Sequence, residues 1–536
     1  MPDRSSSLDA VIIGAGHNGL VCACYLARAG LKVRVVERRA VIGGAAVTQE
    51  FAPGFRNSVA AYTVSLLQPK IIRDLRLHDH GLRVVERPFA NFLPLPDGDS
   101  FQVGPDLAST QRELARFSTR DAARLPDYYA MVEGVAAVLR DLVLKTPPNV
   151  GGGLRDLGRA LSLGFDLKHL DMPSRRDLLQ FFTRSAGEIL DDWFESAAVK
   201  GAFGFDAVVG NFASPYAAGS GYVLLHHAFG EVNGRRGSWG HAIGGMGAIT
   251  TALALEARSH GVEIVTNAAV SKVLSKNGRA SGIVLADGSE VAARVVIGNL
   301  NPKLLYLDLV DAQDLEPDFV ARMQGWRCAS GAFRMNVALA ELPDFTSRPG
   351  TTAQPHHSSG IIIGPSLAYL DRAWSDARAH GMSREPVIEI LIPSTIDDSL
   401  APPGQHVASL FCQQFDPVLP HGQTWDDRRD EAANLIIDTV TRHAPNFKRS
   451  LLATQILSPL DLEREFGLVG GDIFHGRLSL DQLFSARPVL GHADYRSPLK
   501  GLYLCGSGAH PGGGVTGAPG HNAAREILRD LGRALR

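Results

Sequence analysis

Cysteine is scarce in this 536-residue chain, and the way its cysteines are spaced excludes several kinds of site. They are odd in number, include no Cys-x-x-Cys pair, and are Cys22, Cys24, Cys328, Cys412 and Cys505. This pattern argues against a disulfide framework, a zinc site and a dithiol redox centre, and it favours a reducing compartment. Cys22 and Cys24 lie two residues apart on a predicted helix, so we interpret them as small packing side chains.

Long hydrophobic runs and an excess of charge are also absent. No apolar run reaches the roughly 18 residues that a membrane-spanning helix needs. Met1 to Leu8 is short and polar, which predicts no signal or transit peptide. The formal net charge of -2 gives no indication of a nucleic-acid partner, and no spacing among the 18 histidines indicates a metal site. We expect a cytoplasmic protein. Peripheral contact with a membrane stays open, and the sequence carries no sign of the oligomeric state.

Length and composition place the chain among ordinary globular proteins with more than one domain. A chain of 536 residues is too long for one compact core. Hydrophobic residues at 45% and charged residues at 21% are typical of folded proteins. We therefore expect at least two domains, interleaved along the chain.

The N-terminal segment has the order strand, turn, helix, strand. Asp9 to Ile13 is an apolar run, Val21 to Ala29 has the small-residue pattern of a helix, and Lys32 to Val36 is a second predicted strand. The turn before the helix reads Gly14-Ala15-Gly16-His17-Asn18-Gly19, which matches G-x-G-x-x-G. In this motif the glycines permit a tight turn, close approach of a pyrophosphate and close packing of helix against strand. The free N–H groups at the helix N-terminus then face the phosphates.

Glu37 ends the second predicted strand, at about the 20-residue offset where an acidic side chain accepts hydrogen bonds from the adenosine ribose hydroxyls. A carboxylate there repels a 2′-phosphate, so it favours FAD or NAD over NADP. The loop that follows begins at Arg38 and contains Gly43, Gly44 and Ala45, and it is suited to a second close approach beside the pyrophosphate. These residues together predict a dinucleotide site.

A Gly-rich loop near the C-terminus favours flavin over nicotinamide. It follows a predicted buried strand at Leu502 to Cys505 and begins at Gly506 and Ser507. Its later part, with Gly514 and Val515, brings backbone against a flat ring system. A helix expected from about His521 would offer its positive end to a reduced flavin. Because a nicotinamide dehydrogenase needs no such loop, we predict FAD as the cofactor.

These motifs resemble those of FAD-dependent carotenoid desaturases and isomerases of the phytoene desaturase type. The resemblance covers nearly the whole chain and, besides the two Gly-rich loops, includes Trp239-Gly240, Gly244-Gly245-Met246-Gly247, Ile473-Phe474-His475-Gly476 and Ser479-Leu480-Asp481. It implies that the Val270 backbone meets the adenine end and that Gly514 and Val515 lie beside the isoalloxazine. Ser507 stands where relatives carry an acid that holds the ribityl chain.

The substrate side carries a weaker signal. Five histidines are placed to reach a site: His226, His227, His475, His510 and His521. A lone histidine in a Gly-rich loop is more often a structural hydrogen-bonding group, and we select only His475 as a catalytic candidate. No Ser/His/Asp arrangement is recognisable, so the flavin is expected to supply the chemistry.

The expected fold is α/β, with a three-layer, doubly wound FAD-binding domain of the Rossmann type interleaved with a mixed α+β substrate domain. The middle of the chain supports this, because Ala248 to His260 predicts a helix and short strands follow between Val262 and Ile297. The FAD-binding domain is assigned to residues 1–75, 231–302 and 460–536, and the substrate or cap domain to residues 76–230 and 303–459. We expect the active site at their junction.

The expected function is flavin-dependent hydride transfer at a carbon–carbon bond of an apolar substrate such as an isoprenoid or polyene, by desaturation, saturation or isomerisation. A hydride passes to flavin N5, protein groups orient the chain and exclude water, and the electrons leave to oxygen, a quinone or another acceptor. One alternative is an amine oxidase-like enzyme, which needs two aromatic rings flanking the amine, whereas Tyr503 is the only aromatic residue near the final motif. The other is a flavoprotein that mainly binds a protein partner.

Overall fold

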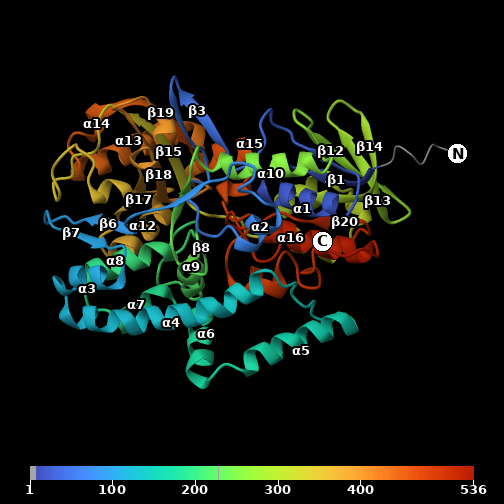
Figure 1. Ribbon diagram of the computed structural model, residues 1–536, viewed down its shortest axis with the longest axis horizontal. Coiled ribbons are helices and arrows are strands. Elements are labelled where there is room, and N and C mark those ends of the chain that lie inside the picture. The colour runs from blue at the N-terminus through green and yellow to red at the C-terminus, as the bar shows by residue number, and fades with distance from the viewer. Residues whose placement is uncertain (1–7, 227, 536) are drawn as a thin grey trace.

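The computed structural model describes residues 8–226 and 228–535. The expectations for the first seven residues and for His227 therefore lie outside the described part of the chain. Two seven-stranded sheets organise the molecule. In Figure 1 the sheet whose strands precede both Gly-rich loops lies on one side, together with three helices, and the other sheet lies opposite. A layer of helices runs along the lower edge.

The first sheet has the strand order β11-β2-β1-β14-β13-β12, with β20 paired to β14. Its strands are β1 (Leu8–Ile13), β2 (Val33–Val36), β11 (Glu263–Val265), β12 (Val270–Lys276), β13 (Arg279–Leu285), β14 (Glu290–Gly298) and β20 (Leu502–Leu504). Strands β11, β2, β1, β14 and β20 are parallel, while β12 and β13 form an antiparallel extension of β14. Residues 10–13 of β1 are all buried, which explains the unbroken apolar run.

Three helices pack together against this sheet: α1 (His17–Arg28), α10 (Gly247–Ser259) and α16 (Ala518–Asp530). Helices α1 and α16 begin earlier than expected: α1 begins at His17 rather than Val21, and α16 at Ala518 rather than His521. The reason for α1 is that the last residues of the glycine motif already form its first turn. Cys22 and Cys24 are buried in this layer, and the Cys24 thiol contacts the Leu253 carbonyl on α10 at 3.4 Å, so the packing interpretation is confirmed.

The second sheet has the order β19-β15-β18-β17-β16-β6-β7 and is antiparallel except between β16 and β6. Its strands are β6 (Asn91–Pro94), β7 (Ser100–Val103), β15 (Ala332–Leu339), β16 (Gly360–Ile363), β17 (Met382–Leu391), β18 (His406–Phe415) and β19 (Leu451–Leu457). Helices α12 (Leu367–His380) and α13 (Trp425–His443) pack against it.

The helical layer fills the lower edge of the molecule (Figure 1). Its helices are α3 (Leu107–Ala115), α4 (Thr119–Val143), α5 (Leu154–Lys168), α6 (Met172–Thr183), α7 (Ala186–Trp193), α8 (Ala197–Gly204) and α9 (Ser220–His226). Three consecutive glycines, residues 151–153, lie between α4 and α5. The other helices are α2 (Pro69–Asp74), α11 (Pro317–Gln324), α14 (Phe447–Ser450) and α15 (Pro459–Phe466), and the short strand pairs are β3 (Thr48–Ala52) with β4 (Phe55–Ser58), β5 (Val84–Glu86) with β10 (Gly240–Ala242), and β8 (Glu231–Val232) with β9 (Arg235–Arg236).

Strand β15 contributes buried side chains to both faces of the second sheet. All eight of its residues are buried. Because side chains alternate across a strand, Phe333, Met335 and Val337 enter the core under α13, while Arg334 and Asn336 face the other side. That other face meets the segment that follows β4, since Asn336 Nδ2 donates to the Val59 carbonyl at 3.4 Å.

All strands of the first sheet lie within residues 8–36, 263–298 and 502–504, so segments distant in sequence build one sheet. The domain boundaries given above stay predictions. Among the described residues, no helix combines the length and the apolar character needed to cross a bilayer.

Candidate functional site

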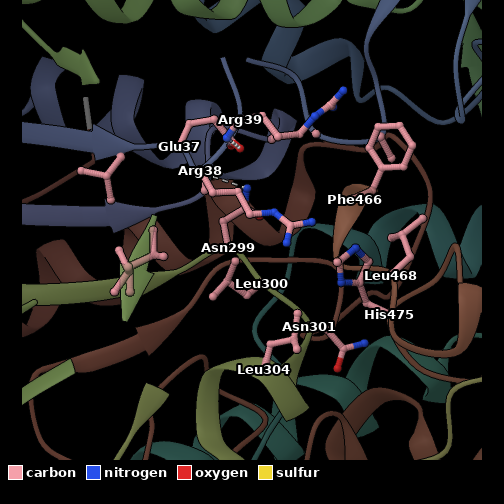
Figure 2. A pocket seen from close by; sticks show the side chains of 18 of the residues that line it. Glu37, Arg38, Arg39, Asn299, Leu300, Asn301, Leu304, Phe466, Leu468 and His475 are labelled. Atoms are coloured by element: carbon pink, nitrogen blue, oxygen red, sulfur yellow. Dashed lines mark hydrogen bonds between the residues drawn. The ribbon is translucent and has the colours of Figure 1, made fainter. Parts of the chain in front are cut away.

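A cavity of about 250 Å³, the dinucleotide cavity, lies at the edge where the parallel strands of the first sheet end. Gly14 follows β1, Glu37 follows β2 and Asn299 follows β14, and all three line this cavity. Figure 2 shows Glu37 and Arg38 on one side, Asn299 to Asn301 below, and His475 and Phe466 opposite. Ligands of open α/β sheets bind at this carboxyl edge, because the strand ends release loops there.

The glycine motif forms a bare backbone cradle at the start of α1. Gly16 caps this helix without a side-chain hydrogen bond, so its first N–H groups stay free for an anion. A Cβ atom on Gly19 would lie 2.4 Å from the Gly14 carbonyl oxygen, so only glycine permits this close packing. Gly43 N donates to the Ala15 carbonyl at 2.9 Å, which holds the second loop against the first.

Glu37 is buried at the end of β2 and anchors both neighbouring loops. Its carboxylate oxygens accept hydrogen bonds from Ala15 N at 2.9 Å and Arg39 N at 3.0 Å. A carboxylate has further lone pairs, so it can also accept from ribose hydroxyls. Arg38 Nη2 donates to the carbonyls of Arg464 and Glu465, at 2.9 and 2.8 Å. The loop after β2 is thereby fixed against α15.

The C-terminal loop meets the glycine motif directly. Asn18 Nδ2 donates to Ser507 Oγ at 3.2 Å. Burial lowers the pKa of His17 to about 4, although a hydrogen bond with the Gly514 backbone acts in the opposite direction. The guanidinium of Arg487 donates to the Ser507 carbonyl at 2.8 Å and to the Phe474 carbonyl at 2.7 Å, which joins this loop to the segment that carries His475.

A second cavity of about 140 Å³, the ring cavity, lies beside Gly514 and Val515. It shares five lining residues with the dinucleotide cavity: His17, Ala45, Leu468, His475 and Ser507. Its wall is mainly apolar, and includes Ala60, Val64, Leu66, Phe205, Val209, Met246, Ile249, Phe411 and Phe474. The two cavities adjoin, so together they form an elongated site with a polar end and an apolar end.

Most predicted cofactor residues line these cavities. They are Gly14, Gly16, His17, Asn18, Glu37, Arg38, Gly44, Ala45, Val270, Ser507, Gly514 and Val515. Four do not line them and instead support the loops: Ala15, Gly19, Gly43 and Gly506. Gly506 illustrates this, since a Cβ there would lie 3.1 Å from the Leu300 carbonyl oxygen.

The histidines separate into two groups. His475 and His226 line the ring cavity, and burial lowers the pKa of each to about 4, so both are neutral at neutral pH. His475 Nδ1 is buried without a hydrogen-bond partner. His510 instead contacts the Leu142 carbonyl at 3.0 Å, and His521 packs edge-on against Tyr25. The last two are structural, and the catalytic role of His475 stays a prediction.

Several lining residues escaped the sequence analysis. Asn299, Leu300 and Asn301 follow β14, so the argument that selected Glu37, a polar residue after a predicted parallel strand, could have found them. Phe466 and Leu468 carry no comparable signal. Tyr503 lies away from the ring cavity, where its hydroxyl donates to Asp530 at 2.9 Å. The aromatic residues that line this cavity come from elsewhere and are Tyr62, Phe205, Trp239, Phe411 and Phe474.

The residues present fit a flavin dinucleotide. His17 Nε2 and Asn18 Oδ1 are buried in the cradle without hydrogen-bond partners. Uncapped helix N–H groups suit a pyrophosphate, the Glu37 carboxylate suits a ribose, and the adjoining apolar cavity suits a ring system. Unsatisfied polar atoms at a bare backbone cradle indicate a ligand that completes the hydrogen bonding.

Comparison with known proteins agrees with this geometry. The family described as flavin containing amine oxidoreductase matches residues 19–330. The chain is 44% identical to rat pyridine nucleotide-disulfide oxidoreductase domain-containing protein 2, over 98% of this chain and 94% of the relative. It is 24% identical to a lycopene-forming phytoene desaturase of Paracoccus sp., over 98% of each chain. The resemblance noted in the sequence is thereby confirmed.

Solved structures show the same fold. Cyclohexylamine oxidase from Brevibacterium oxydans covers 98% of this chain and 100% of its own with a TM-score of 0.56, at 15% identity. An identity this low shows the fold alone, and that fold is the predicted FAD-binding α/β architecture. The motifs, the two adjoining cavities and these relatives lead to one conclusion: the chain belongs to the family of flavin-containing amine oxidoreductases and is an FAD-dependent oxidoreductase.

Proposed function

We propose that this enzyme acts at a carbon–carbon bond of an apolar substrate, of isoprenoid or polyene type, by desaturation, saturation or isomerisation. The observation that carries this proposal is the apolar wall of the ring cavity, in which Leu66, Met246 and Phe474 lie near Gly514 and Val515. An apolar wall gains free energy by burying hydrocarbon and gives none to a strongly hydrated group. The relationship to a phytoene desaturase supports the same type of substrate.

Desaturation removes a hydride from one carbon and a proton from its neighbour, which leaves a double bond. FAD, when bound, supplies the acceptor for the hydride. The proton requires a base at the cavity wall, and the neutral imidazole of His475, whose Nδ1 has no hydrogen-bond partner, lies there. The apolar residues orient the chain and exclude water, so the protein contributes mainly position and environment.

Anaerobic reduction tests this proposal. The FAD-loaded protein is mixed with a panel of polyenes and isoprenoid lipids, and the flavin absorbance band is followed. Substrates of the proposed type should bleach this band, and His475→Gln should slow bleaching while FAD content stays unchanged. If no polyene or isoprenoid bleaches the flavin, the proposal is wrong.

Amine oxidation is the second candidate, favoured by the family to which the chain belongs. It needs two aromatic rings that face one another across a gap wide enough for the amine. Tyr62 and Phe411 line the ring cavity, but they stack on each other at 5.3 Å and leave no gap between them. Peroxide release with amines, and none with polyenes, would select this candidate. Family membership also favours an enzyme over a flavoprotein whose FAD is only structural.

We also propose that α5 contacts a lipid surface. Leu154, Leu157, Leu161 and Phe165 lie on one face of this helix, and all four are exposed, Leu154 to 87%. Lys168 lies on the same face by helical spacing, and Arg155 is exposed beside it. An apolar face with flanking cations suits an interfacial helix at an anionic membrane. Figure 1 shows α5 at the outer edge of the molecule, away from both sheets.

A further inference from the structure

Three side chains form a row across the face of the second sheet that is turned toward the ring cavity. Phe411 on β18 is the register partner of Arg334 on β15 and of Glu389 on β17. Directly paired residues on neighbouring strands project from the same face, so the three lie side by side. Phe411 and Glu389 both line the ring cavity. The sheet therefore places a cation and an anion on either side of one aromatic ring.

Tyr62 covers this row and binds its carboxylate. Its ring stacks on Phe411 and lies 4.4 Å from the Arg334 guanidinium. Its hydroxyl donates to Glu389 Oε2 at 2.5 Å. Burial, followed by the nearby Glu389 charge, raises the pKa of Tyr62 well above its usual value, so the phenol stays protonated and keeps donating. One carboxylate oxygen of Glu389 is thereby occupied within the protein.

Arg87 completes the cluster from the other side. Its Nη1 lies 3.8 Å from Glu389 Oε1, its side chain is only 5% exposed, and its guanidinium lies 5.0 Å from the Trp239 ring. Nη2 donates to Thr63 Oγ1 in a long contact of 3.4 Å. Nε and Nη1 are buried and have no hydrogen-bond partner. A buried guanidinium with two unsatisfied donors is costly unless a ligand pairs with it.

The charges of the cluster do not balance. Arg87 and Arg334 contribute two cations, against the single carboxylate of Glu389. Asp206 also lies near Arg87, but burial raises the pKa of Asp206 to about 7, so this carboxyl neutralises the excess only in part at neutral pH. The unsatisfied atoms on both arginines are donors, since Nε and Nη1 of Arg334 also lack partners. An excess of buried positive charge and free donors matches an anion.

Arg87 lies between the ring cavity and another hollow. An outer cavity of about 490 Å³ is lined by Arg87, Asp206 and Trp239, and Trp239 also lines the ring cavity. Arg87 does not line the ring cavity itself, but it contacts Glu389 and Trp239, which both do. Arg87 can therefore bind a ligand that extends from the ring cavity or one that lies in the outer cavity.

We propose that the substrate is amphipathic: its hydrocarbon part lies beside the flavin ring along the apolar wall of the ring cavity, and a single anionic end group, a carboxylate, binds Arg87 between the ring and outer cavities. This inference rests on the proposed function, because it describes the substrate of the same site. In it Glu389, held by Tyr62, is the carboxylate with which the ligand competes for Arg87, and Arg334 supplies the second positive charge. The enzyme then recognises a fatty or isoprenoid acid, and not a hydrocarbon alone.

Isothermal titration calorimetry on the FAD-loaded protein tests this with laurate, methyl laurate and dodecylamine, which carry the same alkyl chain and differ in charge. Laurate should bind at least about ten-fold more tightly than the ester, because a charge-assisted hydrogen bond contributes that much. Arg87→Gln should reduce laurate affinity to that of the ester, and Arg87→Lys should retain part of the preference.

Arg235→Gln is the matched control. Arg235 also lines the outer cavity, but it is exposed and forms an ion pair with Glu86 at 2.7 Å, so its loss should leave the laurate preference unchanged. If Arg87→Gln does not fold with FAD, Glu389→Gln replaces it: removing the competing carboxylate should tighten laurate binding, and weaker binding would overturn the proposal.

Three other results would also overturn it: equal affinity for laurate and methyl laurate, tighter binding of dodecylamine, or no binding of any of the three. Calorimetry requires no turnover, so the outcome is distinct from that of the bleaching experiment. Laurate binding through Arg87 in a protein whose flavin is bleached by no polyene or isoprenoid would refute the proposed reaction and leave the anion site in place.

Discussion

Two arginines, one in each half of the molecule, are fully buried and yet differ in every hydrogen bond they make. Arg487, beside the C-terminal Gly-rich loop, donates from all three guanidinium nitrogens to backbone carbonyls, those of Phe474, Gly476, Gln482 and Ser507 among them. Arg334, on the second sheet, makes one hydrogen bond, to Ser409 Oγ at 2.6 Å, and leaves Nε and Nη1 unsatisfied.

The two arginines show the difference between a buried cation that supports the fold and one that is available to bind a ligand. A buried cation that is fully paired holds loops together, because each lost contact leaves an unsatisfied carbonyl. A buried cation that keeps unsatisfied donors adds little to stability. The C-terminal Gly-rich loop is thus held by satisfied backbone contacts, whereas the second sheet keeps a buried arginine with unsatisfied donors.

Replacing each arginine by methionine should have very different effects on stability. Arg487→Met should lower the free energy of unfolding by roughly 5 kcal/mol, because several buried carbonyls lose a charged donor at once. Arg334→Met should cost at most about 2 kcal/mol, since one hydrogen bond is lost and a buried charge is removed. Chemical denaturation of the FAD-loaded proteins measures both. Equal losses would show that the two arginines play the same role.

Lowering the pH should weaken the cofactor side through its buried histidines. Burial lowers the pKa of His510 to about 4 in the folded protein, whereas the unfolded chain takes up its proton near pH 6.5. Stability is therefore full above pH 6.5 and falls as the pH falls toward 4, by roughly 3 kcal/mol for one such imidazole.

The variant His510→Gln should flatten the pH dependence, as measured by denaturation at a series of pH values. His421 is exposed, and its replacement by glutamine serves as the control, with an unchanged slope. A slope identical in the His510 variant and the wild type would mean that this imidazole does not couple to folding.

The two sides should also respond differently to a single added methyl group. Gly19→Ala places a Cβ atom 2.4 Å from the Gly14 carbonyl oxygen and should cost about 2 kcal/mol and weaken FAD binding. Gly134→Ala, in α4, meets no atom within 4 Å and should stabilise that helix by up to about 1 kcal/mol. Thermal unfolding and FAD content measure both. A neutral Gly19→Ala would contradict the close packing of α1 on its loop.

The smallest effect on stability is expected at the outer helix. Leu161→Glu in α5 should change the free energy of unfolding by less than about 0.5 kcal/mol, because the side chain is 56% exposed. It should nevertheless reduce co-sedimentation with vesicles that contain anionic lipid. Leu452→Glu, at a leucine that is 50% exposed on β19, should leave vesicle binding unchanged. A change in oligomeric state without any vesicle binding would indicate that α5 contacts a second copy instead.

The cofactor side was largely predictable because its determinants are local. The order of strand, glycine turn, helix and strand lies within residues 8–36, and Glu37 follows directly. Each of these features appears as a short pattern, and the conclusion that two Gly-rich loops meet agrees with the contact between Asn18 and Ser507. The missed residues Asn299 and Asn301 come shortly after the parallel strand β14, just as Glu37 follows β2. The helix starts were misplaced, because glycine obscured the first turns.

The substrate side was not predictable in this way. Arg334, Glu389 and Phe411 come together through sheet register, and Tyr62 and Arg87 join them from a distant segment. Each residue alone resembles an ordinary strand or loop residue, so no spacing marks it. The ring cavity likewise gathers its aromatic residues from separate parts of the chain, and the only aromatic residue that the sequence placed near the final motif lies elsewhere.

The sequence by itself thus determined the cofactor class and the sheet that holds it, because backbone turns and helix starts depend on neighbouring residues. Only the tertiary structure decided which charges gather near the ring cavity and that two of them, Arg87 and Arg334, keep unsatisfied donors. The physical reason is that pairing across strands and burial of charge depend on contacts between segments hundreds of residues apart, such as Tyr62 with Glu389.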